Sequence, residues 1–145
     1  MSDRTQRVVP ALSYEDGLAA LEWLARAFGL RERAEERHLW EDGRLAHAEV
    51  ETEGGDVIAL ATPTPDYEGP RRHREHCEPA RRWSSVPYVI DGLLVYVDDV
   101  EAHYERARRE GATILSELED GPPARRYRAE DLEGHRWMFM QRGGA

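Results

Sequence analysis

Residues 127–140 read Tyr-Arg-Ala-Glu-Asp-Leu-Glu-Gly-His-Arg-Trp-Met-Phe-Met, and the fold can be worked out from this stretch. Segments 125–129 and 136–141 are predicted strands, and Gly134 suits the tight turn between them. A similar turn precedes an apolar run at 57–61. Its Gly55 lies 79 residues before Gly134, which indicates that one unit occurs twice in the chain.

Each copy also contains a predicted helix. Residues 17–28 carry apolar side chains at helical spacing, with capping groups before them and Gly29 after them. A second helix follows Asp98-Asp99 and ends at Gly111. The remaining predicted strands are 7–12, 45–50, 92–97 and 113–118, with turns at 41–43 and 119–121 and an extended segment at 31–40. The order β-α-β-β-β therefore appears twice.

The stretch between the copies differs in composition. Residues 63–90 hold several prolines and a charged cluster at 71–76, which is typical of a long connection. We therefore expect a single domain over 1–145, with module one at 7–62, a connection at 63–90 and module two at 91–141.

Composition narrows the possible functions. The 145 residues include 20 basic residues, all Arg, and 29 acidic residues, giving a net charge of −9. This balance argues against nucleic-acid binding and mildly favours cationic or neutral ligands. We expect no membrane association, because no apolar run approaches the ~20 residues of a membrane span. The N-terminus lacks a signal peptide and Cys77 is the only cysteine, so we expect a cytoplasmic protein.

Several motifs, spread over nearly the whole chain, resemble the vicinal oxygen chelate superfamily. This superfamily includes glyoxalase I, extradiol dioxygenases and bleomycin-resistance proteins, and the resemblance is greatest to its PhnB-like, glyoxalase-like group. The matching segments are 9–16, 20–29, 46–50, 95–100, 109–112 and 127–137, and the Asp-x-x-Gly-His-x-Trp pattern at 131–137 is among the more specific. The resemblance implies an α+β fold of tandem βαβββ modules, forming a curled mixed sheet with an open cup. It also implies a small-molecule ligand on the concave face, and a homodimer.

Metal-using members of the superfamily place ligands in the first and last strands of each module. These positions correspond here to Arg7, Ala59, Gly92 or Leu93, and Met138, and none of these side chains suits a hard divalent ion. We therefore expect no cofactor, and we argue against glyoxalase-type isomerisation and extradiol cleavage, which require that metal. His73, His76 and Cys77 lie close together in sequence, but their arginine- and proline-rich surroundings favour a solvated linker over a zinc site.

The candidate ligand-binding residues come from both modules and the connection. His47 and Glu49 share one strand face and could perform acid–base chemistry or hold a cationic ligand; a surface-facing pair is the alternative. His38 and Trp40 lie across the 42–43 turn from them, and Trp40 could form a stacking wall.

Further candidates are Trp83 and Tyr88 in the connection, Tyr96 on the fifth predicted strand, and Met138 on the last. The connection aromatics, Tyr67 included, either cover the cup or anchor the loop. Trp137 is expected in the core, and His103 and His135 at the surface.

These observations lead to three functional hypotheses. The first is a metal-free small-molecule binding protein, whose ligand could be a cationic antibiotic or metabolite. The second is a lyase or isomerase that uses His47 and Glu49 or a non-standard metal site. The third is an assembly or regulatory module without a ligand. Because the usual metal positions lack ligand residues, we favour binding over catalysis.

Overall fold

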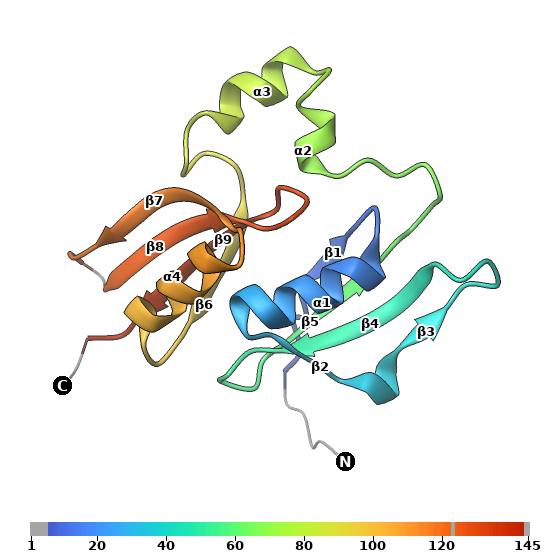
Figure 1. Cartoon of the computed structure of the whole chain (residues 1–145), viewed down its shortest axis with the longest axis horizontal. Helices are drawn as coiled ribbons and strands as arrows, with labels where there is room; N and C mark the ends of the chain where they lie inside the picture. The colour runs from blue at the N-terminus through green and yellow to red at the C-terminus, as the bar shows by residue number, and fades with distance from the viewer. Residues whose placement is uncertain (1–5, 123, 144–145) are drawn as a thin grey trace.

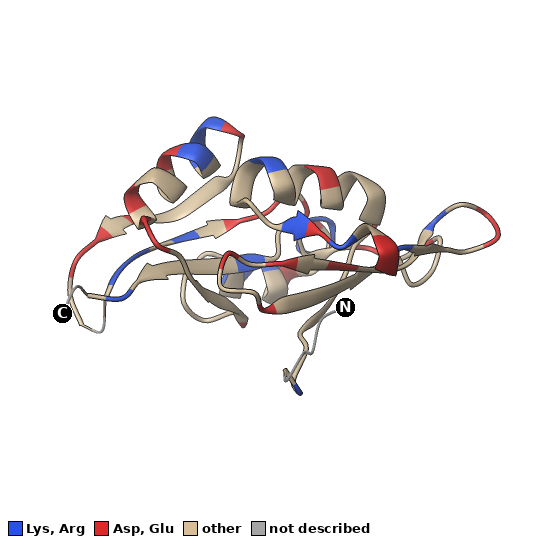
Figure 2. Ribbon diagram, turned by 90° about the horizontal axis from the view of Figure 1, so that it is seen from below, with Lys and Arg blue, Asp and Glu red and all other residues tan. Residues whose placement is uncertain are grey.

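The computed structural model describes residues 6–122 and 124–143. Two sheets lie side by side, and α1 and α4 cover the same side of both (Figures 1 and 2). The elements of the first module are β1 (Ala11–Ser13), α1 (Gly17–Phe28), β2 (Arg31–Glu32), a 3₁₀ turn η1 (Ala34–Glu36), β3 (His38–Leu39), β4 (Leu45–Glu51) and β5 (Val57–Ala61). Those of the second are β6 (Gly92–Tyr96), α4 (Val100–Arg109), β7 (Thr113–Glu119), β8 (Arg125–Glu130) and β9 (Arg136–Gln141).

The two sheets have the same topology. The strand orders are β1-β5-β4-β2, with β3 also paired to β4, and β6-β9-β8-β7. In each sheet the first strand runs parallel to the last, and the other pairs are antiparallel. Neither sheet closes on itself, so the predicted α+β fold of tandem βαβββ modules is confirmed. We call the side of each sheet that faces away from α1 and α4 its open face.

Matching hydrogen bonds confirm the repeat. The Gly55 amide donates to the Thr52 carbonyl, as the Gly134 amide donates to Asp131, 79 residues later. Asp16 and Asp99 cap α1 and α4 in the same way, each accepting from the amide three residues ahead. These turns and helix caps are therefore satisfied in the same way in both modules.

One core joins the two modules on the helix side. α1 buries Leu21, Leu24 and Phe28 at helical spacing, and α4 buries Tyr104 in the same core. The Phe28 ring lies 4.7 Å from the ring of Phe139 on β9. The Trp137 ring lies 5.4 Å from Phe28 as well, which confirms its expected place in the core, so aromatic packing crosses between the modules.

His103 is half-buried, although we expected it at the surface. Its ring lies 4.0 Å from Phe139; Nε2 is 3.0 Å from the Phe28 carbonyl and Nδ1 is 2.6 Å from the Tyr127 hydroxyl. Burial lowers the pKa of His103 to about 4. His135 is also half-buried, with Nε2 2.7 Å from the Ser13 carbonyl. Both imidazoles satisfy backbone groups of the other module, which explains why these polar side chains are not at the surface.

The first predicted strand is shorter than expected. It begins at Ala11 and not at residue 7, because the Gln6 side chain occupies the backbone groups of Val57 that a longer strand would pair with. Segment 31–40 is also not continuously extended, since η1 separates β2 from β3.

The connection contains two short helices, α2 (Pro70–His73) and α3 (Glu78–Ser84), and is not a plain loop. Both have proline in the first helical positions, where its fixed φ favours a helix start. Figure 1 shows them beyond the edge of the two-layer body. Over the described ranges, none of the helices combines the length and hydrophobicity needed to cross a bilayer.

Candidate functional site

The open face of the second module combines apolar and basic side chains. Leu94, Met138 and Arg128 are register partners across β6, β9 and β8, so they project on the same side. The residues between them along the strands, including Phe139 and Tyr127, belong to the core. An apolar strip on β6 and β9 therefore adjoins a basic strip on β8.

A pocket of about 230 Å³ lies over this face. Its lining includes Tyr88, Ile90, Leu94, Met138, Arg128 and Arg136. The first two belong to the connection, which thus forms one wall over a floor made by the sheet. An apolar hollow with a few polar groups is the usual form of a small-molecule site.

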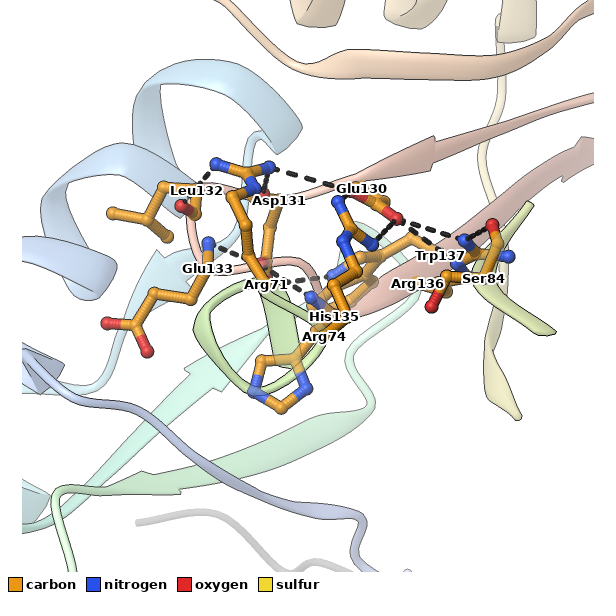
Figure 3. A network of polar contacts seen from close by, with 10 residues as sticks. All are labelled: Arg71, Arg74, Ser84, Glu130, Asp131, Leu132, Glu133, His135, Arg136 and Trp137. Atoms are coloured by element: carbon orange, nitrogen blue, oxygen red, sulfur yellow. Dashed lines mark hydrogen bonds and ion pairs between the residues drawn. The ribbon is translucent and has the colours of Figure 1, made fainter. Parts of the chain in front are cut away.

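A buried ion network positions the wall of this pocket (Figure 3). The side chain of Glu130 is 1% exposed and accepts from Arg74 at 2.7 and 2.9 Å and from Arg136 at 3.1 and 3.2 Å. Arg136 also donates to the carbonyls of Ser84 and Val86, just before Tyr88. Burial alone would raise the pKa of Glu130, but the two guanidinium groups lower it overall, so the carboxylate stays ionised. The network therefore ties the connection to β8 and β9.

The 131–134 turn ties the modules together beside this network. The Asp131 carboxylate accepts from the Tyr14 hydroxyl at 2.6 Å and from the Trp137 indole at 3.1 Å. Gly134 has a φ of 95°, and a Cβ there would lie 2.8 Å from the Arg71 amide nitrogen. Arg71 in turn donates to the Asp131 carbonyl, as Figure 3 shows. The specific sequence pattern at 131–137 is thus explained by packing between the modules.

The open face of the first module carries an imidazole and carboxylates beside small side chains. His47 Nε2 lies 3.3 Å from Glu49 Oε2, and Arg33 is 3.7 Å from the same carboxylate. The His38 ring lies 6.3 Å from that of His47, its register partner. Ala59 lies beside Glu49, on β5.

The predicted site residues fall into separate groups. His38, His47 and Glu49 lie together on the first module, while Tyr88 and Met138 line the pocket of the second. The other three lie elsewhere. The Trp40 indole donates to the Thr62 carbonyl, and Trp83 is exposed beneath the Arg82 guanidinium. Tyr96 lines another hollow, of about 470 Å³, between β6 and the segment before β1.

Sequence reasoning missed Arg128, Arg136 and Leu94 as pocket residues. The signal was present in the alternation of β8 and β9: with Tyr127 and Phe139 assigned to the core, Arg128 and Met138 must face the other way.

The residues at the superfamily's metal positions do not fit a metal. Ala59 and Met138 lie on the open faces, paired with Ala11 and Leu94, and these side chains offer no hard donor. Within residues 6–122 and 124–143, no three His, Cys, Asp or Glu side chains gather to form a ligand set.

Comparison with known proteins agrees with this fold. The model of the glyoxalase/bleomycin resistance protein/dioxygenase superfamily matches residues 8–139. The chain belongs to this superfamily. An uncharacterized protein of Mycobacterium tuberculosis is 30% identical over 137 residues, covering 91% of this chain and 72% of that protein.

Solved structures of the superfamily are similar over nearly the whole chain. TioX from Micromonospora sp. ML1 has a TM-score of 0.66 and 28% identity, covering 95% of this chain and 99% of TioX. TnmS3, an antibiotic binding protein from Streptomyces sp. CB03234, has a TM-score of 0.62 and 19% identity, covering 97% of this chain and 99% of TnmS3. The resemblance predicted from the sequence motifs is thereby confirmed at the level of the superfamily.

Proposed function

We propose that the protein binds a small molecule, without a metal, in the pocket on the open face of the second module. The observation that carries this proposal is the pocket itself, whose apolar floor lies beneath a wall held by the Glu130–Arg136 network. TnmS3, an antibiotic binding protein, has the same fold, so this fold can carry small-molecule binding.

The experiment uses 2-naphthylmethanol, an uncharged aromatic probe, in a calorimetric titration. We expect saturable binding, and we expect Leu94→Trp to abolish it by filling the pocket. Leu94 is 46% exposed, so the larger side chain is tolerated by the fold. Leu39→Trp, an exposed apolar position on the first module, is the matched control and leaves binding unchanged. Equal binding by both variants would contradict the proposed site.

Independence from metal is tested by melting scans with Zn²⁺, Ni²⁺, Mn²⁺ and Fe²⁺. An ion that binds the native state but not the unfolded chain raises the melting temperature by mass action. We expect no saturable shift with any of the four. A saturable rise in the melting temperature that a chelator reverses would contradict metal-free binding.

The His47–Glu49 pair supports a second candidate, an acid–base enzyme of the lyase or isomerase type. The 3.3 Å contact places an imidazole and a carboxylate together on an open face. This candidate predicts turnover of a carbonyl or lactone substrate that His47→Gln abolishes. A ligand that binds the wild type and is recovered unchanged favours the binding protein.

We also propose a homodimer, as the superfamily resemblance implies. Val8 and Tyr96, exposed apolar side chains outside the lining of the ligand pocket, support an association through β6 and the segment before β1. Light scattering at micromolar concentration should give twice the chain mass of 16.7 kDa, and a single-chain mass would contradict the proposal.

A further inference from the structure

The open face of the second module carries more positive than negative charge, although the whole chain is acidic. Glu119 lies 3.3 Å from Arg126 and 3.4 Å from Arg128, so one carboxylate is shared by two guanidinium groups. Glu130 is shared in the same way by Arg74 and Arg136. Asp91 is a third carboxylate, in the pocket lining, so four guanidinium groups face three carboxylates and this face keeps an excess of positive charge.

Arg128 is the basic group best placed to use that excess. It lines the pocket, its side chain is 23% exposed, and its contact with Glu119 is long at 3.4 Å. Within the described part of the chain its Nε and Nη2 groups have no hydrogen-bond acceptor. A guanidinium with free donors beside an apolar floor matches the planar geometry of a carboxylate.

We infer that the ligand of this pocket is a small aromatic carboxylate, with its carboxylate at Arg128 and its rings on Leu94 and Met138. This inference rests on the proposed function and adds the chemical class of the ligand. The volume of about 230 Å³ suits a body of one or two rings and is below the range of drug-sized sites.

The net charge of −9 does not reverse this preference. Charges spread over the surface act through solvent and are screened within about 8 Å at physiological salt. The guanidinium of Arg128 would touch the ligand directly, on a face partly removed from water. The local charge therefore outweighs the net charge, and the pocket prefers an anion over the cationic ligand that composition favours.

The experiment compares three isosteric probes by calorimetric titration: 2-naphthoate, 2-naphthylmethanol and 2-naphthylmethylammonium. We expect affinity to fall in that order, with about a tenfold preference for the anion over the alcohol, as one charge-assisted hydrogen bond provides. Added salt should weaken the binding of 2-naphthoate and leave that of the alcohol unchanged.

Three variants assign the preference to Arg128. Arg128→Gln should reduce the affinity for 2-naphthoate about tenfold and leave the alcohol within about twofold. Arg125→Gln is the matched control, because Arg125 lies on the same strand and pairs with Glu101 of α4 on the helix side; it should change neither. Glu119→Gln should increase the affinity for 2-naphthoate about threefold, because it removes the carboxylate that competes for Arg128.

The outcomes separate this inference from the proposed function. Equal affinities for anion and alcohol, a preference for the ammonium probe, or an unchanged preference in Arg128→Gln would overturn the carboxylate inference while leaving small-molecule binding in place. Failure of all three probes to bind saturably would overturn the proposed function, and the inference with it.

Discussion

The two modules share a backbone and differ on their open faces. The first module places Ala11, Ala59 and Glu49 in one row across β1, β5 and β4. At the equivalent positions the second module has Leu94, Met138 and Arg128. Small side chains beside an acid thus correspond to bulky apolar side chains beside a base.

The same 79-residue offset gives a second contrast. Ala61 and His47 on the first module correspond to Met140 and Arg126 on the second. The helix side of both sheets is constrained by a shared core, so its side chains are apolar in both copies. The open faces have no such constraint and have diverged, which is why the fold alone does not locate the site.

The largest expected difference between the modules concerns Glu130 and its equivalent, Glu51. Glu130→Gln should lower the free energy of unfolding by about 3–5 kcal/mol, because it leaves the buried charge of Arg136 without its partner. The side chain of Glu51 is 30% exposed and faces Arg31 and Arg33 at 3.4 Å or more, so Glu51→Gln should cost less than about 1 kcal/mol. Urea unfolding of both variants checks this, and equal losses would show that the ion network is not specific to the second module.

The pH dependence of stability should depend on His103, which replaces Ala20 of the first module in the repeat. The pKa of His103 is lowered from 6.5 to about 4 in the folded chain, so the unfolded chain binds more protons between these values. Its stabilising contribution is complete above pH 6.5 and is lost as the pH falls towards 4, by up to about 3 kcal/mol. Urea unfolding at several pH values gives the free energy of unfolding as a function of pH. Its slope between pH 4 and 6.5 should be shallower in His103→Gln than in the wild type. An unchanged slope would contradict the buried, neutral imidazole.

The start of α1 should be less tolerant of added volume than a surface turn. The first module has Gly17 where the second has Val100, because a Cβ at Gly17 would lie 2.6 Å from Leu45 Cδ2. Gly17→Ala should therefore destabilise the protein by about 2 kcal/mol through overpacking. Gly54→Ala, where the nearest side-chain atom is 3.9 Å away, is the control and should be nearly neutral. Thermal unfolding distinguishes the two, and a neutral Gly17→Ala would mean that Leu45 can move aside.

The smallest expected effect concerns the apolar floor of the pocket. Met138→Ala should weaken the binding of 2-naphthylmethanol about fivefold, because it removes about 1 kcal/mol of apolar contact. Leu39→Ala on the first module should leave the affinity unchanged, since Leu39 lies away from the pocket lining. If both variants bind as the wild type does, the probe does not rest on β9.

Much of the fold could be predicted from local signals. The caps at Asp16 and Asp99 and the turns at Gly55 and Gly134 depend on neighbours in sequence, and all four were identified. The short helices of the connection were missed because its proline-rich composition also suits a loop.

The pocket and the half-buried His103 depend on contacts between distant segments. The environment of His103 is made by Phe28 and Phe139, from the other module and the last strand. Met138 and Tyr88 were identified as candidates, but that they share a pocket with Arg128 follows only from the Arg136 contacts that place the connection. Such contacts leave no local pattern in the sequence.

The central claim, that the second module and not the first carries the ligand, is tested most directly by amide NMR during a titration with 2-naphthoate. We expect saturable shifts of the amide signals of Leu94, Arg128 and Met138, while those of the equivalent residues Ala11, Glu49 and Ala59 stay in place. Shifts confined to the His47–Glu49 face would contradict it and assign the ligand to the first module.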